Sequence, residues 1–381
     1  MKNHTAFTAL DYKHQAKRKL PKFVFDFIDG GSGNEDSLTR NSLAFNNIHL
    51  LPSIKNTKEA FVFHTEILGL DYAAPFGIAP LGLCGLVDPN AELILAKAAA
   101  KYRIPYTISS ATNISLERIV KASGVAPWFQ LYIPRLDSQL DVLLQLAENQ
   151  SCPVLVVTTD TPVPGRRLRD LRNGLKIPYQ LSYANVVESL LSPRWTAKRL
   201  LAGKLNFPNY SNLLDVNPKM RFSELMSLQT GGALDWDRLQ EIRDKWPRKL
   251  VFKGIVSTQD AHKAKNIGAD AIIISNHGGR QLNSSPAPIT VLPSLLNEGL
   301  DTDFLFLDSG IRSGEDIVKS LSIGAGFTFV GRLFLYALAA GGEQAIDRLI
   351  NILIEECTLD LKLIGANSPK DAKGKSKHIY Q

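Results

Sequence analysis

Eight short runs of apolar residues, rich in β-branched side chains, recur along the chain without alternating with polar residues. Such runs are expected of parallel strands that are buried on both faces. Helical stretches such as 91–101 and 115–122 lie between them. Eight strand–helix units in a row predict an α/β fold, a (β/α)₈ TIM barrel, and their regularity disfavours the alternative of a doubly wound open sheet. The runs cover residues 74–80, 104–109, 127–133, 154–159, 250–253, 271–275, 304–308 and 327–331.

One interval is much longer than the others, because strand four ends near residue 159 and strand five begins near 250. A helix over 237–246 fills part of it, and about 171–230 is interpreted as an insertion in the loop after strand four. Ala184 to Leu191 show helical spacing, and a second helix starts at Ser192-Pro193 and contains Trp195, Lys198, Arg199, Leu200 and Leu201. Basic residues beside Trp and Leu suit a helix on an anionic bilayer, while a lid on the barrel mouth or a subunit contact are the alternatives.

The chain divides into three parts on this interpretation. Residues 1–60 form a helical segment that packs on the barrel, with one helix over 8–28 that stops at a glycine cluster. The barrel spans 61–365, and 366–381 form a basic, solvated tail with Lys370, Lys373, Lys375 and Lys377. The formal net charge is +7. Without zinc-finger spacing or an aromatic basic strand, this charge does not predict nucleic-acid binding.

Targeting and redox signals are few. The N-terminus lacks an apolar signal-peptide core, and no apolar stretch is long enough to span a bilayer. Three widely spaced cysteines predict neither a disulfide framework nor a metal site. We therefore expect a cytoplasmic protein that uses no metal, with peripheral contact at the cytoplasmic face of the inner membrane as the further possibility.

Polar residues stand at nearly every predicted strand end, where barrel enzymes carry their active sites. The segment 275–281, Ser-Asn-His-Gly-Gly-Arg-Gln, is the strongest of these signals. His277 is the candidate proton acceptor and Arg280 offers a rigid fork to a carboxylate. Asp160, from the loop after strand four, is expected to orient His277 and stabilise its charged form; a plain salt bridge at the mouth is the alternative.

The last two strands end in glycines and arginines, a pattern typical of a phosphate site in barrels. Asp308-Ser309-Gly310-Ile311-Arg312 follows strand seven and Gly331-Arg332 follows strand eight. Lys253 lies on a buried strand, and a buried lysine needs an anionic partner. A flavin that becomes anionic on reduction would supply one.

These motifs, in this order from about Leu20 to Gly365, resemble the FMN-dependent α-hydroxy acid dehydrogenases and oxidases, a family that includes mandelate dehydrogenases, L-lactate dehydrogenases and glycolate oxidases. The resemblance implies His277 as the base, Asp160 as its partner, Tyr132 at the reacting carbon and Lys253 beside the flavin. It implies Arg280 and Arg167 as the carboxylate clamp. The residues expected to hold FMN are Pro80, Leu81, Gly82, Ser109, Gln130, Thr158, Lys253, Ser275, Asp308, Ser309, Gly310, Arg312, Gly331 and Arg332.

Two substitutions depart from the family pattern. Phe27 replaces a tyrosine whose hydroxyl helps to bind the substrate carboxylate, and Ala111 replaces the tryptophan of glycolate oxidase. The first removes a donor and the second enlarges the pocket, so both concern the substrate more than the reaction.

The resemblance implies oxidation of an (S)-2-hydroxy acid, with a bulky or aromatic side chain, to the 2-oxo acid. Electrons would pass to a quinone or another carrier, with oxygen as the alternative acceptor. Another alternative is an atypical substrate that Phe27 permits. The resemblance also implies a homotetramer. A flavin- or phosphate-binding barrel without redox activity is disfavoured by the set His277, Asp160, Arg280 and Lys253. A basic nucleic-acid or membrane adaptor is supported only by the tail and the insertion.

Overall fold

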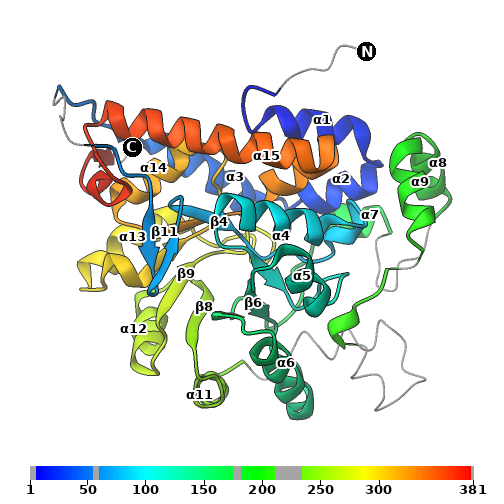
Figure 1. Cartoon of the computed structure of the whole chain (residues 1–381), viewed down its shortest axis with the longest axis horizontal. Helices are drawn as coiled ribbons and strands as arrows, with labels where there is room; N and C mark the ends of the chain where they lie inside the picture. Colours follow the sequence, from blue (N-terminus) through cyan, green and yellow to red (C-terminus); the bar gives the residue numbers. More distant parts are fainter. Residues whose placement is uncertain (1–5, 55–59, 175–181, 204, 211–233, 379–381) are drawn as a thin grey trace.

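Eight parallel strands form one sheet in the order β4-β11-β10-β9-β8-β7-β6-β5. The computed structural model describes residues 6–54, 60–174, 182–203, 205–210 and 234–378. A parallel bridge between Ile78 and Tyr106 connects β4 to β5 and closes the sheet. The predicted barrel is therefore confirmed and the open sheet is excluded (Figure 1). The strands are β4 (Phe76–Ile78), β5 (Thr107–Ser109), β6 (Trp128–Leu131), β7 (Val154–Thr158), β8 (Lys249–Ile255), β9 (Ala271–Ile274), β10 (Leu305–Leu307) and β11 (Phe327–Val330).

A plug of aromatic residues fills the amino-terminal end of the barrel. Trp128 and Phe327 begin their strands, and Phe329 lies 5.4 Å from Trp128 and 5.3 Å from Phe327 between ring centroids. A hairpin of β2 (Thr65–Ile67) and β3 (Leu70–Tyr72) covers this end, where the Trp128 indole N–H donates to the Tyr72 hydroxyl at 2.8 Å. The sequence did not predict this hairpin. Because this end is packed shut, only the carboxyl ends of the strands can hold a site.

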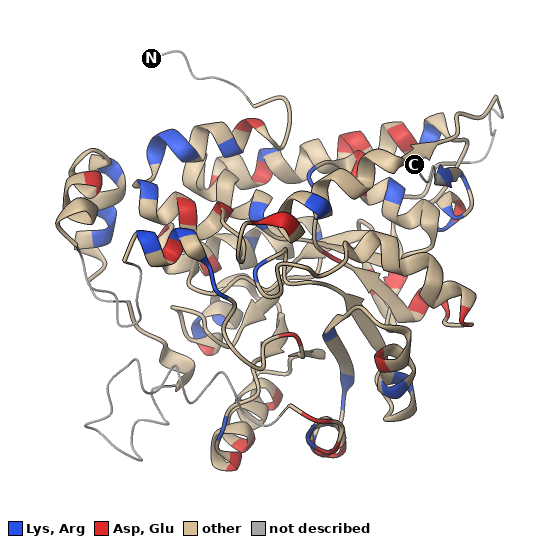
Figure 2. Cartoon of the chain, turned by 180° about the vertical axis from the view of Figure 1, so that it is seen from behind, with Lys and Arg blue, Asp and Glu red and all other residues tan. Residues whose placement is uncertain are grey.

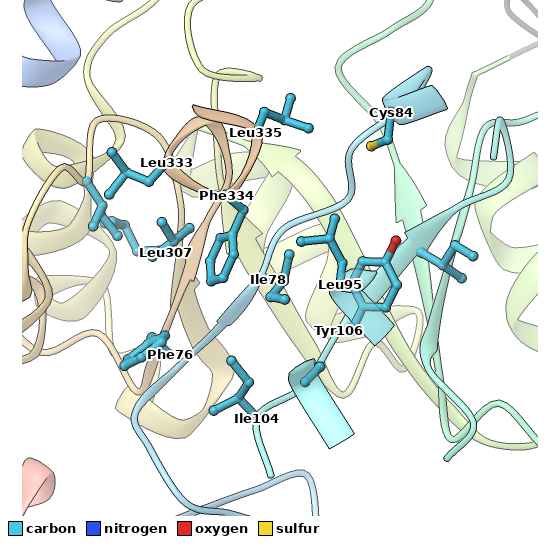
Figure 3. Packing of buried hydrophobic residues seen from close by; sticks show 14 of the residues in the cluster. Phe76, Ile78, Cys84, Leu95, Ile104, Tyr106, Leu307, Leu333, Phe334 and Leu335 are labelled. Carbon is cyan, nitrogen blue, oxygen red and sulfur yellow. The ribbon is translucent and has the colours of Figure 1, made fainter. Parts of the chain in front are cut away.

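Helices surround the sheet and bury its outer face (Figure 1). Figure 3 shows part of this layer, where Phe76 and Ile78 of β4 pack among Leu95, Tyr106 and Phe334. Glycine 342 interrupts the last helix with non-helical backbone angles. The helices are α4 (Ala91–Tyr102), α5 (Leu116–Ser123), α6 (Asp137–Asn149), α11 (Trp236–Lys245), α12 (Thr258–Asn266), α13 (Pro288–Asn297), α14 (Gly314–Ile323) and α15 (Arg332–Leu363).

The N-terminal segment is two helices where one was predicted. Helix α1 (Asp11–Lys19) and helix α2 (Lys22–Asp29) are separated because Leu20, which precedes Pro21, is extended. Helix α3 (Asp36–Leu43) and a 3₁₀ turn (Ala44–Asn47) follow. In Figure 1, α1 and α2 lie along α15 on one side of the barrel.

The C-terminal residues do not form the free, solvated tail that the lysines suggested. Strand β12 (Ser376–His378) pairs antiparallel with β1 (Ile48–Leu50) near the other end of the sequence. Between α15 and β12, a 3₁₀ turn (Pro369–Ala372) buries Ala372, and Lys373 donates to the Thr302 hydroxyl at 2.7 Å. Hydrogen bonds along the backbone therefore bind this segment to the barrel, which charge alone could not indicate.

The insertion begins with α7 (Leu168–Arg172) and continues with a hairpin of α8 (Tyr183–Leu190) and α9 (Pro193–Leu201), as the helical spacing predicted. Trp195 is buried and its indole N–H donates to the carbonyl of Leu86 at 2.8 Å. Lys198 pairs with Asp88 at 2.6 Å and Arg199 donates to the carbonyl of Gly85 at 2.7 Å. The predicted basic, Trp-containing bilayer face of α9 is thus wrong in part, because these three side chains contact the barrel.

Leucines, instead, form the solvent face of this hairpin. The exposed fractions of Leu190, Leu191, Leu200 and Leu201 lie between 70% and 90%. Figure 2 shows the hairpin at one extremity of the molecule, beside the basic residues of α1. None of the described helices is long and apolar enough to cross a membrane. The predicted insertion between 211 and 230 lies outside the described residues.

Candidate active site

A cavity opens at the carboxyl ends of the strands and encloses a space of about 850 Å³, part of which is open to solvent. The pocket wall brings together residues that are far apart in the sequence, many of them predicted. It includes Phe27, Ile28, Ala79, Pro80, Leu81, Gly82, Tyr132, Thr158, Lys253, His277, Gly278, Arg280, Asp308, Ser309, Gly310, Ile311, Arg312, Gly331, Arg332 and Leu335.

His277 and Asp160 are paired at this mouth. The imidazole Nδ1 lies 3.0 Å from Asp160 Oδ1. Burial alone would raise the pKa of Asp160, but the charge and hydrogen bond of His277, together with Lys253, hold that pKa below its usual value. The carboxylate therefore stays ionised, and it stabilises positive charge on the imidazole when Nε2 takes a proton.

Two arginines lie over the same aromatic ring. The guanidinium carbon of Arg280 is 5.1 Å from the centroid of Phe27, and that of Arg167 is 5.9 Å away. Arg280 donates through Nη1 to the carbonyls of Phe27 and Gly30 at 2.8 and 2.9 Å. Burial, and then repulsion by Arg167 and Arg332, lower the pKa of Arg280 to about 9. An anionic ligand would relieve this repulsion.

Lys253 is buried and lines the cavity. Its Nζ donates to the Ser275 hydroxyl at 2.9 Å and lies 3.1 Å from Asp308. Burial by itself lowers the pKa of the ammonium, but the carboxylates of Asp308 and Asp160 outweigh burial, so that the pKa is raised. Lys253 is therefore a permanent positive charge. Burial likewise raises the pKa of Tyr132, whose phenol faces the same cavity and stays protonated.

Three predicted cofactor residues form a chain of hydrogen bonds across adjacent strands. Ser109 donates to Gln130 at 2.9 Å, and the Gln130 amide donates to Thr158 at 2.9 Å. The chain fixes the amide orientation, so that these buried groups present a defined row of donors and acceptors at the strand ends. Of this row, Thr158 lines the cavity itself, whereas Ser109 and Gln130 are not among its lining residues.

The residues of the last two strands fit a phosphate group. Arg312 and Arg332 both line the cavity, and burial together with Arg312 lowers the pKa of Arg332 to about 10. Helix α15 begins at Arg332, so its free amide groups and dipole face the same place. Two neighbouring cations at a helix N-terminus match the dianionic phosphate of FMN, and Lys253 is available to the flavin ring.

Two predicted substrate residues, Arg167 and Ala111, are not among the residues that line the cavity. Arg167 lies over the ring of Phe27, which does line it. Ala111 contributes no lining side chain. It is buried, and it lies about 4.0 Å from where a side chain at Gly82 would project. Gly82 does line the cavity, so a larger residue at 111 would press on that wall. The small residue therefore enlarges the pocket from behind. Within the described residues, no group of three His, Cys, Asp or Glu is placed to hold a metal.

Two residues without an earlier assignment also support the site. Gln281 donates to the Asp160 carbonyl at 2.9 Å and accepts from the Gly165 amide at 2.9 Å, which joins the two loops that carry His277 and Arg167. Asp170 forms an ion pair with Arg167. Gln281 lies inside the segment 275–281, and the three-residue spacing between Arg167, which precedes α7, and Asp170 on that helix is a signal that the sequence contains.

The fold and the cavity define a class, a (β/α)₈ enzyme whose cationic site fits a phosphorylated cofactor and an anionic substrate. The chain belongs to the FMN-dependent dehydrogenase family, whose profile matches residues 16–379, and FMN is therefore its cofactor. It is 36% identical to the (S)-mandelate dehydrogenase of Pseudomonas putida over 94% of this chain and 90% of that protein. It is 35% identical to the L-lactate dehydrogenase of Vibrio parahaemolyticus serotype O3:K6 over 95% of this chain and 96% of that protein.

Solved structures give the same result. The crystal structure of the monotopic membrane protein (S)-mandelate dehydrogenase superposes with a TM-score of 0.92 at 33% identity, covering 99% of this chain and 100% of that one. That of a mandelate oxidase superposes with a TM-score of 0.81 at 31% identity, covering 98% of both chains. The protein is an FMN-dependent dehydrogenase by family, and these comparisons support the expected fold and cofactor.

Proposed function

We propose that the protein oxidises an (S)-2-hydroxy acid with a bulky or aromatic side chain to the 2-oxo acid. The observation that carries this proposal is the position of the His277–Asp160 pair in the same cavity as Arg280, with Arg167 over the same Phe27 ring. A base beside a carboxylate clamp fits a substrate whose reacting carbon is adjacent to its carboxylate. The relatives named for mandelate and lactate support the same substrate class.

Each residue of the site has a separate role in the proposed reaction. FMN supplies the acceptor for the two electrons that leave the substrate. Arg280 and Arg167 bind the substrate carboxylate and so orient the reacting carbon. His277 takes a proton at Nε2, either from the α-carbon or from the hydroxyl, while Asp160 stabilises the imidazolium. Tyr132 donates a hydrogen bond at the reacting carbon's oxygen, and Lys253 balances negative charge that develops at the cofactor ring.

The pocket favours large substrates on two grounds. Ala111 leaves the wall at Gly82 free, and Phe27 presents an aromatic face where a hydroxyl is usual in the family. Loss of one donor weakens the hold on a small hydroxy acid, which depends on its carboxylate for most of its binding. A substrate with an apolar side chain recovers that binding free energy by burying surface.

Anaerobic titration of the purified holoenzyme tests the function directly. Small and aromatic hydroxy acids, each as both enantiomers, are added and the flavin absorbance is followed. We expect bleaching by (S)-mandelate at lower concentration than by (S)-lactate, and slow or no bleaching by the (R) forms. A flavin that no hydroxy acid bleaches would contradict the proposal, and preferential bleaching by glycolate would contradict the substrate assignment.

The exposed leucines of α8 and α9 support peripheral attachment to a membrane. We propose that the attachment is on the cytoplasmic side and that a membrane quinone accepts the electrons. A monotopic relative of nearly the same fold is consistent with this placement. Reoxidation by a quinone analogue in the absence of oxygen should exceed reoxidation by air; rapid formation of hydrogen peroxide would instead identify an oxidase. The homotetramer is a proposal from the family resemblance, and light scattering of the purified enzyme tests it.

A further inference from the structure

Asp170 is a buried carboxylate close to the two candidate carboxylate-binding arginines. It lies on α7, one helical turn after Arg167, and only 6% of it is exposed. Its Oδ2 lies 2.7 Å from Arg167 Nε. A carboxylate is costly to bury without a partner, and removal of either partner of such a pair leaves an uncompensated charge.

The negative charge of Asp170 interacts with both Arg167 and Arg280. Burial raises the pKa of Asp170, while the charges of Arg167 and Arg280 act in the opposite direction. In turn, Asp170 offsets part of the repulsion that Arg167 and Arg332 exert on Arg280. One internal carboxylate therefore allows two guanidinium groups to lie close together beside the cavity, even when the cavity holds no substrate.

The anchoring also leaves donors available. Arg167 contacts Asp170 through Nε, at the edge of its guanidinium, and Arg280 contacts two backbone carbonyls through Nη1. Within the described part of the chain, the terminal nitrogens of Arg167 and the Nη2 of Arg280 have no hydrogen-bond acceptor. A guanidinium held by one nitrogen keeps its remaining N–H groups for a second anion.

We propose that Asp170 is a positioning residue that fixes Arg167 by its Nε, so that the remaining donors of Arg167 and Arg280 grip the substrate carboxylate together. The inference rests on the proposed function and deepens it, because it assigns carboxylate recognition to a unit of three side chains. Arg167 is partly exposed on the loop that opens the insertion, so without this anchor its long side chain is free to turn into solvent.

The test compares Asp170→Asn, Asp170→Ala and Asp170→Glu with the matched control Glu241→Gln. In the control, an acid three residues after an arginine is removed from α11, far from the cavity. Binding of benzoylformate to the oxidised holoenzyme is measured by calorimetry, and KM and kcat are measured with (S)-mandelate and with its uncharged amide. The calorimetric measurement needs no turnover, so a failure of the proposed function is seen separately, as absence of flavin reduction in the wild-type enzyme.

We expect Asp170→Ala to weaken benzoylformate binding and raise the KM for mandelate by about tenfold or more, which is the scale of one charge-assisted hydrogen bond. Asp170→Asn, which preserves shape, should fall in between, and Asp170→Glu should restore part of the loss. The kcat, the FMN content and the affinity for the amide should change little. An equal loss for acid and amide would show a merely structural role, and unchanged acid binding in Asp170→Asn and Asp170→Ala would also overturn the proposal.

Discussion

His277 Nδ1 lies 3.0 Å from Asp160 Oδ1, although the two residues follow different strands, β9 and β7. The pair commits one ring nitrogen to the carboxylate and leaves Nε2 for the substrate. Asp160 receives further support from Lys253, whose positive charge helps to keep the carboxylate ionised. The geometry therefore lets Asp160 stabilise the imidazolium that forms when Nε2 takes a proton.

His277→Gln should retain FMN and lose reduction by substrate. Glutamine preserves polarity and approximate size but cannot take the proton, and a lost general base typically slows a reaction by about 10²–10⁴-fold. Stopped-flow flavin reduction under anaerobic conditions measures the effect, with the flavin spectrum as the control for folding. A reduction rate within about tenfold of wild type would remove His277 from the base position.

Arg280→Lys should raise the substrate KM and slow flavin reduction. An ammonium group cannot reproduce the planar fork, and it cannot donate to the Phe27 and Gly30 carbonyls while it also binds a carboxylate. Steady-state and single-turnover kinetics measure the two effects. The exposed basic substitution Lys263→Arg on α12 is a control that should leave both values unchanged, and unchanged values in Arg280→Lys as well would contradict the clamp.

Phe27→Tyr tests whether the aromatic face or the absent hydroxyl matters more. If the hydroxyl reaches the carboxylate, kcat/KM for lactate and mandelate should rise by up to about ten- to a hundredfold, since a hydrogen bond to a charged group contributes roughly 1.5–3 kcal/mol. If Phe27 packs on an apolar part of the substrate, activity on that substrate should fall. Kinetics with small and aromatic hydroxy acids distinguish the two results; no change on any of them would show that the ring does not contact substrate.

Asp29→Asn should lower stability at neutral pH but not in strong acid. Burial would raise the pKa of Asp29, but hydrogen bonds from Lys13, Tyr336 and Arg169 lower it to about 2. A folded-state pKa below the ordinary 3.8 stabilises the fold above about pH 4, and this stabilisation disappears as pH falls through the folded value. The difference corresponds to about 2 kcal/mol.

Denaturant unfolding of both proteins at pH 7 and at or below about pH 2, where Asp29 is protonated in the folded state, measures this dependence. The exposed Glu298→Gln on the helix-to-strand turn serves as the control, because a solvated carboxylate should change stability little at either pH. Equal destabilisation by Asp29→Asn at both pH values would mean that packing, and not charge, causes the loss.

Replacing Leu190, Leu191, Leu200 and Leu201 by serine should release the protein from anionic liposomes while it retains FMN. The reason is that the four side chains are exposed in this structure and pack against no core, so their loss removes membrane contact without opening a cavity. Sedimentation with liposomes measures the partition. Leu359→Ser with Leu363→Ser on α15 is a matched exposed pair away from the hairpin. Equal partition of all three proteins would exclude the hairpin as the attachment site.

The sequence indicated the barrel because buried parallel strands carry a local signal that needs no tertiary information. The eight runs enclose the eight strands of the barrel sheet, except that β8 extends past its run at both ends. Their polar ends pointed to His277, Asp160, Lys253 and Arg280, because the carboxyl ends of barrel strands converge. The pairing of β1 with β12 had no such signal, since two three-residue strands more than 300 positions apart leave no mark in local periodicity.

The insertion also shows a limit of prediction from local sequence patterns. Spacing predicted α8 and α9, but amphipathicity does not reveal which face meets the protein. Trp195, Lys198 and Arg199 find partners at Leu86, Asp88 and Gly85, in a turn about 110 residues earlier. This face of α9 therefore meets the barrel, whereas the leucines face solvent. The break at Pro21, by contrast, was readable from the residue before proline.

Three successive residues at the mouth, His277, Gly278 and Gly279, all have positive φ, at 57°, 65° and 75°. A side chain at Gly279 would come within 2.5 Å of the Leu38 backbone, and one at Gly278 within 2.6 Å of Arg332. The tight turn therefore limits which residues can replace these three. A left-handed backbone at position 277 favours residues such as Asn, Asp and Gly and disfavours β-branched residues. A change of substrate is therefore expected from substitutions in the surrounding pocket, at Phe27 or Ala111, and not from substitutions in the turn that carries the base.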